Sequence, residues 1–347
     1  MTDVDVLVIG GGPVGLAAAA HAARAGFEVA VVEPRTGPID KACGEGLMPG
    51  ALACLQRLDV SPRGFDLAGI AYCQGELRAE HAFESGAGRG VRRTVLHGAL
   101  AERVADAEIP VLTGRVERLE QSEDRVRVGG TGIDGLQARW LLGCDGLHST
   151  VRELAGLAAR PAGPARRRFG LRRHVRVAPW SDLIEVYWAP AAEVYVTPTA
   201  DDLVGIAVLG PAGMRFEDGL QSVPELAERL GSAKFDGPVR GAGPLQQRTS
   251  ARTSGRVLLV GDASGYVDAL TGEGLRVGFA QAEAAVHALV CDDPRGYERS
   301  WRRVTRETRL LTAGLLAGAR SGWRDRIVPT ATRAPAVYGA IVERLAR

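Results

Sequence analysis

The chain has 347 residues, enough for about two domains with a sizeable core. Its 43 basic and 41 acidic residues nearly cancel, so the overall charge offers no polybasic field for nucleic acid or anionic lipid, and a small-molecule partner is expected. Five scattered cysteines form no CxxC or Cys/His pattern, which predicts free thiols in a reducing compartment and no metal site. There is no basic leader, and the longest apolar stretch spans about ten residues, which predicts a cytoplasmic protein without integral membrane association.

The chain begins with a pattern typical of a β-strand, a helix and a second strand. Residues 4–9 are apolar, residues 14–25 are rich in alanine, and residues 28–33 are again apolar and end in an acid. Further along we expect helices over 51–58, 94–107 and 274–290, strands near 68–83, 111–119, 126–142, 182–188, 192–197, 203–209 and 256–260, and a mostly helical tail over 299–347. This order predicts an α/β domain interrupted by a β-rich one.

A glycine-rich turn follows the first strand and opens the first helix. Gly10, Gly12 and Gly15 form a G-x-G-x-x-G motif, in which the glycines permit the tight turn, the approach of a pyrophosphate and close helix–strand packing. Glu33 lies 18 residues beyond Gly15, near the spacing expected of an acid that accepts a ribose hydroxyl. The motif therefore predicts a dinucleotide site that favours FAD or NAD over NADP.

Two later segments distinguish between these cofactors. An apolar strand leads into Gly143-Cys144-Asp145-Gly146, and a second one, residues 256–260, ends in Gly261-Asp262. With these motifs the chain resembles, over nearly its whole length, the FAD-dependent superfamily that includes p-hydroxybenzoate hydroxylase and the geranylgeranyl reductases. The resemblance implies that Asp262 binds the ribityl hydroxyls of FAD and that a helix opening at Gly272–Leu275 faces the flavin ring, where its positive end stabilises the reduced flavin.

The resemblance extends to an arginine–leucine pattern and to the fold. Arg93, followed by Leu96 and Leu100, matches the family's R-x-x-L-x-x-x-L pattern and is expected near the pyrophosphate or ribityl chain. The implied fold is α/β: a glutathione-reductase-type FAD-binding Rossmann domain with an inserted β-rich substrate domain and a helical C-terminal segment. The expected cofactor-binding residues are Gly10, Gly12, Pro13, Gly15, Glu33, Arg35, Gly44, Arg93, Asp145, Gly261, Asp262, Gly272, Gly274 and Leu275.

The domain boundaries follow from the same patterns. We expect the FAD-binding domain over 1–164, with a short β excursion near 68–90, and again over 250–298; the β-rich substrate domain over 165–249; and the helical segment over 299–347. Only one dinucleotide fingerprint is present, so electrons are expected from NAD(P)H bound without its own Rossmann domain or from a separate flavin reductase.

The two main branches of the superfamily receive conflicting support. Three markers of the hydroxylases are missing, because Gly265, Ala269 and Arg276 stand where those enzymes have histidine, proline and asparagine, and the loop at Cys43 resembles that of geranylgeranyl reductases. A strand that lines the lipid cavity of those reductases instead carries Glu193, Tyr195 and Thr197 here, which predicts a more polar wall and a compact or amphipathic, perhaps phenolic, substrate.

Several side chains are candidates for chemistry at the flavin. We consider Cys43, Tyr195 and Glu273 as catalytic residues, and Arg172, Tyr187, Tyr195 and Thr197 as substrate-binding residues. Simpler explanations stand beside these roles: close packing for the cysteine, core packing for the tyrosines, exposed charge for the arginine, and the helix dipole for the glutamate.

The sequence favours a flavin monooxygenase acting on a small or amphipathic organic substrate, possibly phenolic or polyketide-like. The alternative is a flavin-dependent C=C reductase resembling the geranylgeranyl reductases, and a third possibility is a flavin protein with a structural or sensory function. Halogenation is excluded because the W-x-W-x-I-P motif is missing and only two lysines, Lys41 and Lys234, are available.

Overall fold

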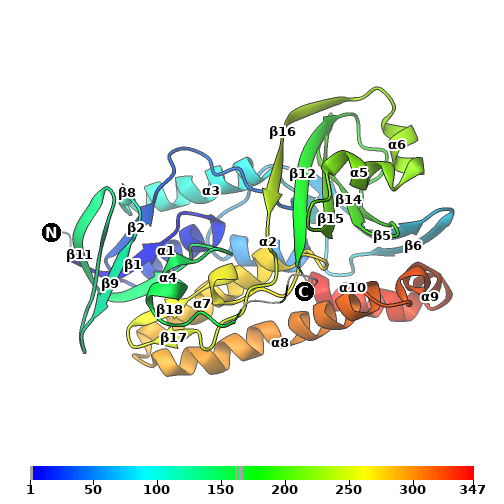
Figure 1. Cartoon of the computed structure of the whole chain (residues 1–347). Coiled ribbons are helices and arrows are strands. Elements are labelled where there is room, and N and C mark those ends of the chain that lie inside the picture. Colours follow the sequence, from blue (N-terminus) through cyan, green and yellow to red (C-terminus); the bar gives the residue numbers. More distant parts are fainter. Residues whose placement is uncertain (1–2, 161–162, 164–166) are drawn as a thin grey trace.

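The computed structural model describes residues 3–160, 163 and 167–347, which form two large β-sheets side by side with helices packed against both (Figure 1). Among these residues no helix is long and apolar enough to cross a membrane. The expected α/β fold with a helical C-terminal part is confirmed.

The first sheet carries the glycine-rich turn at one end of its central strand. β1 (Asp3–Ile9) lies between β2 and β11 and is parallel to both, so all three strands direct their carboxyl ends toward the same edge of the sheet. Ligands of such sheets bind at that edge. The other members are β2 (Val29–Glu33), β8 (Val111–Thr113), β9 (Arg118–Gln121), β10 (Val126–Gly130), β11 (Ile133–Gly143), β17 (Thr253–Ser254) and β18 (Val257–Leu259).

The helices of this half contact the first sheet through small side chains. In α1 (Pro13–Arg24) the residues Ala17–Ala20 are fully buried, which lets α7 (Gly274–Val290) and α3 (Arg93–Asp106) pack closely against it. α2 (Pro49–Gln56) and the short α4 (Thr150–Leu154) complete this half. Because α1 and α7 both begin at the ligand edge, their N-terminal N–H groups face the same space.

The second sheet is built largely from the inserted β-rich region. Its order is β16-β12-β15-β14-β13-β5-β6, with β5 parallel to β13 and the remaining pairs antiparallel. The β excursion in the first half of the chain thus completes this sheet. The strands are β5 (Gly69–Gln74), β6 (Leu77–Ala82), β12 (Arg168–Arg176), β13 (Leu183–Trp188), β14 (Glu193–Ala200), β15 (Leu203–Pro211) and β16 (Lys234–Ala242).

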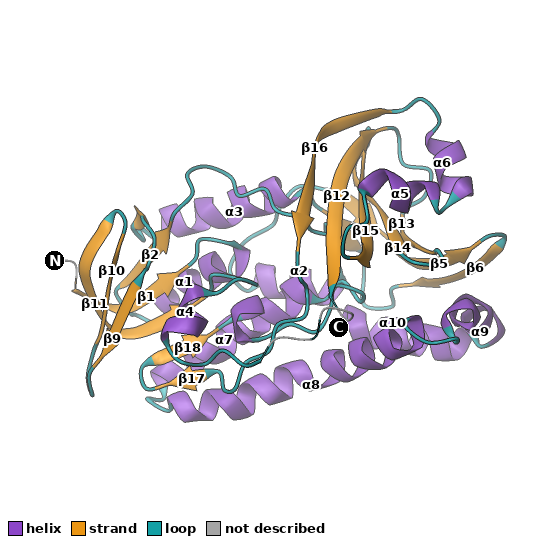
Figure 2. Ribbon diagram, in the orientation of Figure 1, coloured by secondary structure: helices purple, strands orange, loops and turns teal. Residues whose placement is uncertain are grey.

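The two faces of the second sheet have different neighbours (Figure 2). α5 (Phe216–Gln221) and α6 (Pro224–Leu230) pack on the outer face. The inner face looks toward the FAD-type domain, with a small sheet of β3 (Gly46–Leu47), β4 (Phe65–Leu67) and β7 (Gly88–Gly90) between the two halves. The C-terminal helices α8 (Pro294–Ala319), α9 (Ile327–Arg333) and α10 (Pro335–Ala346), with the 3-10 turns η2 (Gly261–Ser264) and η3 (Arg324–Arg326), complete the fold.

Candidate flavin site

The glycine-rich turn has the geometry that a bound pyrophosphate requires. Gly10 has a φ of +107°, and a Cβ added there would lie 2.6 Å from the carbonyl oxygen of Cys144. A Cβ at Gly15 would lie 1.8 Å from the carbonyl oxygen of Gly10, whereas one at Gly12 would meet no atom within 4 Å. The first glycines therefore close the turn and pack it, while Gly12 leaves open space in front of the N-terminus of α1. That helix begins at Pro13 without a side-chain cap, so its free N–H groups remain available for an anion.

Glu33 lies at the end of β2, directly beside this turn. Its buried carboxylate accepts hydrogen bonds from the Gly11 backbone N–H at 2.8 Å and from Arg35 Nε at 2.7 Å. These bonds hold the carboxylate at the wall of the cavity, which both Glu33 and Arg35 line. The placement agrees with the expected ribose contact, and that role remains a prediction.

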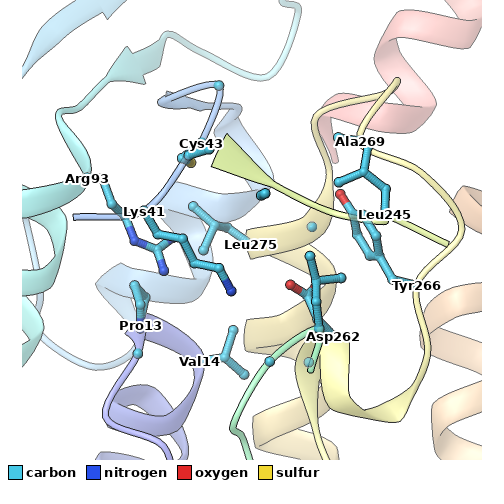
Figure 3. Close-up of a pocket in the computed structure, with 18 of the residues that line it drawn as sticks. Pro13, Val14, Lys41, Cys43, Arg93, Leu245, Asp262, Tyr266, Ala269 and Leu275 are labelled. Atoms are coloured by element: carbon cyan, nitrogen blue, oxygen red, sulfur yellow. The ribbon is translucent and has the colours of Figure 1, made fainter. Parts of the chain in front are cut away.

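Charged side chains converge on the middle of the cavity from three distant segments (Figure 3). The Asp262 carboxylate makes no hydrogen bond to any described residue, and burial raises its pKa although the charges of Lys41 and Arg93 oppose this effect. The Lys41 ammonium reaches across the cavity toward Gly146, and burial lowers its pKa. Two cations and a carboxylate therefore face one space, an arrangement that suits a ligand with a pyrophosphate and hydroxyl groups.

The turn before α7 provides the second backbone approach to the cavity. Gly261 and Gly272 have φ values of +65° and +72°, and both line the cavity together with Gly274 and Leu275. Glu273 does not line it. Its buried carboxylate forms an ion pair with Arg276, and burial raises its pKa to about 7. The glutamate thus lies outside the cavity and contacts Arg276 in the first turn of α7, and nothing in its position favours the catalytic role that we considered.

Asp145 has a local structural role at the same edge. Its Oδ2 accepts the backbone N–H of Val151 at 3.0 Å, at the start of α4, where Ser149 also accepts the N–H of Arg152 at 2.9 Å. The other carboxylate oxygen, Oδ1, is buried and has no partner among the described residues. Asp145 therefore caps a helix with one oxygen and keeps the other for a further donor.

The cavity extends from the glycine turns to the inner face of the second sheet and encloses about 550 Å³. Its far wall is mostly apolar, and the polar groups there are the side chains of Tyr72 on β5 and of Tyr195 and Thr197 on β14. Glu193 is not part of this wall, since it is fully buried in ion pairs with Arg168 and Arg324. The expected polar wall is therefore corrected. The apolar lining residues are Met48, Ile70, Ile184, Val186, Ala207, Leu209, Leu245, Leu270 and Val342.

Strand register separates the two candidate tyrosines. Tyr195 pairs with Val186 and faces the cavity, whereas Tyr187 pairs with Val194 and faces the outer side of the sheet. The Tyr187 hydroxyl donates to Glu185 Oε2 at 2.8 Å in that outer layer. The expectation that Tyr187 contacts substrate is therefore wrong. The Tyr195 hydroxyl donates to the carbonyl oxygen of Leu270 at 2.6 Å, so this proton is already engaged.

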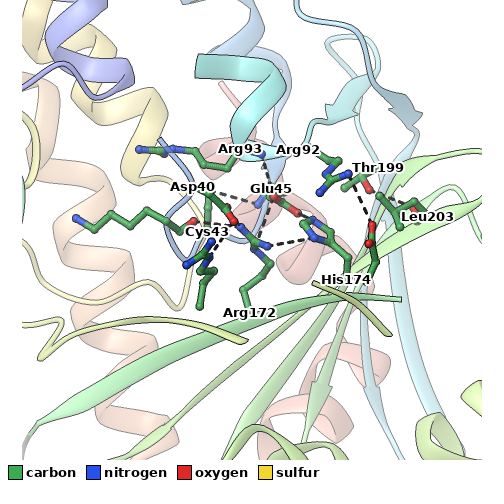
Figure 4. Close-up of polar contacts among 12 residues, drawn as sticks. Asp40, Cys43, Glu45, Arg92, Arg93, Arg172, His174, Thr199 and Leu203 are labelled. Atoms are coloured by element: carbon green, nitrogen blue, oxygen red, sulfur yellow. Dashed lines mark hydrogen bonds and ion pairs between the residues drawn. The ribbon is translucent and has the colours of Figure 1, made fainter. Parts of the chain in front are cut away.

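Arg172 belongs to a buried ionic cluster behind the cavity (Figure 4). Its guanidinium pairs with Asp40 and lies 3.7 Å from Glu45 Oε1, while His174 Nε2 lies 2.7 Å from Glu45 Oε2. Glu45 also accepts the backbone N–H of Arg93 at 2.9 Å and has a φ of +62°. Arg172 does not line the cavity, so the expected substrate contact is corrected: the arginine ties the loop over 40–45 to the second sheet.

That loop places Cys43 at the cavity. Cys43 is half-buried and lines the cavity with Gly44, at which an added Cβ would meet no atom within 4 Å. The Cys43 Sγ lies 3.4 Å from the backbone N of Glu45. The thiol therefore remains accessible to a ligand, and its catalytic role stays a prediction.

Two residues that line the cavity were not among the predicted site residues. Lys41 lies two residues before Cys43. Only the fold shows that its ammonium group faces Asp262 across the cavity. Tyr266 follows the second Gly-Asp, and its hydroxyl makes no hydrogen bond to any described residue. Burial raises the pKa of Tyr266 well above its usual range, so the phenol keeps its proton at neutral pH. Its position five residues from Gly261 was the available signal.

The residues present fit FAD. Gly12 and Gly44 leave room for close approach of a ligand, and Arg93 Nε and Asp145 Oδ1 are buried without partners beside that room. Asp262 and the N-termini of α1 and α7 supply an acceptor for hydroxyls and donors for anionic groups. The cavity also exceeds the dinucleotide end, leaving space for a substrate against the second sheet.

Comparison with known proteins agrees with this geometry. Residues 3–292 match the family described as FAD binding domain. The chain is 30% identical over 339 residues to a digeranylgeranylglycerophospholipid reductase of Methanosarcina acetivorans, covering 88% of this chain and 82% of that one. It is 28% identical over 323 residues to para-nitrophenol 4-monooxygenase of a Pseudomonas species, covering 82% and 77%. The structure of a flavin-dependent brominase superposes with a TM-score of 0.86 at 15% identity, covering 99% and 94%, a likeness of fold alone.

Reductases and monooxygenases of one superfamily are thus both among the relatives of this protein. The matched residues include both large sheets and the helices from α1 to α7. The chain belongs to the FAD binding domain family and is an FAD-dependent oxidoreductase of the superfamily that includes p-hydroxybenzoate hydroxylase and the geranylgeranyl reductases.

Proposed function

We propose that this oxidoreductase reduces a C=C bond in an amphipathic substrate with a long apolar tail. The observation that carries the proposal is the apolar inner wall of the cavity, which adjoins a second apolar hollow between α8 and α10. Tyr72, Thr271 and Leu345 line both spaces. A tail longer than the cavity therefore has an apolar place to continue. The sequence favoured oxygenation because it predicted a polar cavity wall that includes Glu193. Since Glu193 does not line the cavity, the wall is more apolar than predicted, and we now favour reduction over oxygenation.

FAD, when bound, supplies the hydride for such a reduction. The chain must then orient the double bond, exclude water and supply one proton to the second carbon. Ile184 and Val186 on β13 and Leu209 on β15 present an apolar surface that can do the first two tasks. The relative from Methanosarcina acetivorans, a reductase of a lipid by its name, supports a substrate of this kind.

The Tyr266 hydroxyl is the proton donor that the geometry supports best. It borders the cavity beside Asp262, is protonated at neutral pH, and has no hydrogen-bond partner among the described residues. Cys43 on the opposite side is the second candidate. Tyr195 is a weaker one because its hydroxyl donates to Leu270. We assign Tyr195 and Thr197 to orienting the polar end of the substrate.

The proposed electron source is NAD(P)H or a separate flavin reductase. The described cavity has one glycine-rich pyrophosphate turn, and FAD would use it. A nicotinamide would then bind transiently without a Rossmann turn of its own.

Anaerobic turnover tests the reaction type. The holoenzyme, photoreduced under nitrogen, is mixed with polyprenyl quinones or alkenyl phenols, and products are analysed by mass spectrometry. A gain of two hydrogens at a C=C bond of the tail without oxygen, distinguished by fragmentation from reduction of the quinone ring to a quinol, supports the proposal, and Tyr266→Phe should slow the gain at least about tenfold. Products that form only with O₂ and carry oxygen-18 from it would refute reduction.

Monooxygenation of a tailed phenol is the second candidate. Thr197 Oγ1 makes no hydrogen bond to a described residue, so it is free to bind a phenolic oxygen, and the match to a nitrophenol monooxygenase supports this reading. The same experiment, repeated with oxygen, separates the two.

A further inference from the structure

The C-terminal helices concentrate positive charge that the whole-chain balance conceals. Residues 294–347 contain twelve arginines, no lysine and four acids, a net charge of +8, whereas the complete chain carries +2. Of the four acids, Glu307 pairs with Arg344 and Glu343 is buried beside His81. The remainder of the protein is therefore net negative, and the excess of positive charge lies in this region, shown in orange to red in Figure 1. Two of its arginines, Arg299 and Arg324, pair with acids outside the segment, Asp293 and Glu193.

An apolar groove opens in the same region. It encloses about 480 Å³ between α8 and α10 and is lined by Leu311 and Leu315 on one side and Val337 and Ile341 on the other. At its rim Leu310, Trp323 and Val337 are about 60% exposed, at 63%, 62% and 60%. Exposed large apolar side chains gathered beside a groove mark a contact surface rather than scattered surface variation.

Basic and apolar residues share one stripe of α8. Arg299, Arg303 and Arg306 precede Leu310 by eleven, seven and four residues, spacings that place all four side chains on the same exposed side of the helix. No acid in the described part of the chain pairs with Arg303 or Arg306. Arg326 also lines the groove, with its guanidinium 5.1 Å from the Trp323 ring centroid.

We propose that this surface, the α8–α10 face (Arg303, Arg306, Leu310, Trp323, Arg326, Val337 and Ile341), docks the protein on an anionic lipid bilayer. Arginines beside exposed tryptophan and aliphatic side chains are the combination that binds at the headgroup–acyl boundary. No described helix can cross the membrane, so the contact is peripheral. A second copy of this chain is a poorer occupant, because a symmetric contact would bring the two +8 regions together.

The α8–α10 face adjoins the flavin cavity, so docking on a bilayer would bring the cavity close to lipid-dissolved substrate. The groove shares Tyr72, Thr271 and Leu345 with the flavin cavity, so a lipid-dissolved substrate could pass from the bilayer to the flavin along apolar side chains. This delivery role rests on the proposed function. Docking itself does not, and it is measured without any substrate.

Vesicle flotation tests the docking. Flavin-loaded full-length protein is mixed with substrate-free vesicles of phosphatidylcholine alone or with about 30% phosphatidylglycerol, whose negative surface potential attracts arginine side chains. We expect binding to the anionic vesicles that falls with salt. Arg303→Glu/Arg306→Glu should weaken it about 30-fold or more, and Leu310→Asn/Val337→Asn should weaken it about tenfold.

A matched control variant shows whether the loss of binding is specific to the α8–α10 face. Arg118→Glu/Arg127→Glu makes the same charge change on β9 and β10, at the end of the molecule away from α9 and α10, and should float like the wild type (Figure 2). Wild type that does not float, or equal loss in both charge-reversed variants, would overturn the proposal. A dimer that dissociates in Leu310→Asn/Val337→Asn, with no vesicle binding, would assign the face to a second copy instead. Far-UV circular dichroism and retained flavin confirm that each variant is folded.

Discussion

The two ends of the cavity recognise their ligands by different means. At the cofactor end the backbone approaches the ligand, because Gly10, Gly12 and Gly15 remove side chains that would collide with the turn or the pyrophosphate. At the substrate end the wall consists of side chains such as Ile184 and Tyr195 from adjacent strands. A backbone surface has one permitted shape, whereas a side-chain surface can change residue by residue. We therefore expect substitutions at the cofactor end to abolish function and those at the substrate end to change selectivity.

Gly15→Val should have the largest effect. A Cβ at Gly15 would lie 1.8 Å from the Gly10 carbonyl oxygen, so the turn cannot keep its shape. We expect protein that retains no flavin absorbance near 450 nm (about the position of the oxidised flavin band). Gly98→Ala in α3, where an added Cβ meets no atom within 4 Å, should retain it. Equal flavin content in the two variants would show that the turn tolerates a side chain.

Arg172→Met tests the buried ionic cluster that joins the loop over 40–45 to the second sheet. The substitution leaves Glu45 and Asp40 with fewer cationic partners in a buried cluster, so we expect a loss of about 3 kcal/mol in the free energy of unfolding. The loop over 40–45 should also loosen, seen as faster reaction of Cys43 with a thiol reagent. Arg176→Met, on the same strand but exposed, should cost less than about 0.5 kcal/mol.

Glu273→Gln tests the raised pKa of this buried carboxylate through the pH dependence of the free energy of unfolding. The folded-state pKa of about 7 lies above the usual value of 4.5, so the folded protein binds a proton that the unfolded chain has released between these values. Wild-type stability should therefore fall relative to the variant as pH rises from about 4.5 to about 8, by about 3 kcal/mol, and the difference should then stay constant. Urea unfolding of both proteins across this range measures it. A difference independent of pH would place the Glu273 pKa near its ordinary value.

Thr197→Val should have the smallest effect, but its effect should differ between phenolic and purely apolar ligands. The change keeps the side-chain volume and removes one hydroxyl from the cavity wall. For a phenolic ligand that bonds this hydroxyl we expect about tenfold weaker binding, and for a purely apolar ligand less than a twofold change. Thr199→Val, on the same strand but outside the cavity, provides the control. Equal effects on both ligand classes would exclude Thr197 from recognition of the polar end.

The cofactor end was largely predictable because its signals are contiguous in sequence. The glycine turn, Glu33 and Asp262 each lie at the end of an apolar run, and parallel strands bring such ends to one edge. The helix over 274–290 matches α7 because an N-terminal glycine motif and an apolar face define it locally. Local sequence was sufficient wherever a residue's neighbours in the fold are also its neighbours in the chain.

The substrate end depended on contacts that join distant residues. The motifs and their resemblance to a known superfamily were sufficient to predict a flavin-binding α/β protein with a β-rich insertion. The packing of the two sheets was needed to show that Tyr195 faces the cavity while Tyr187 does not, and that Glu193 pairs with Arg324, 131 residues away. Alternation along a strand defines two faces, but which face is covered by helices and which by the flavin domain is set by how the sheets and helices pack together.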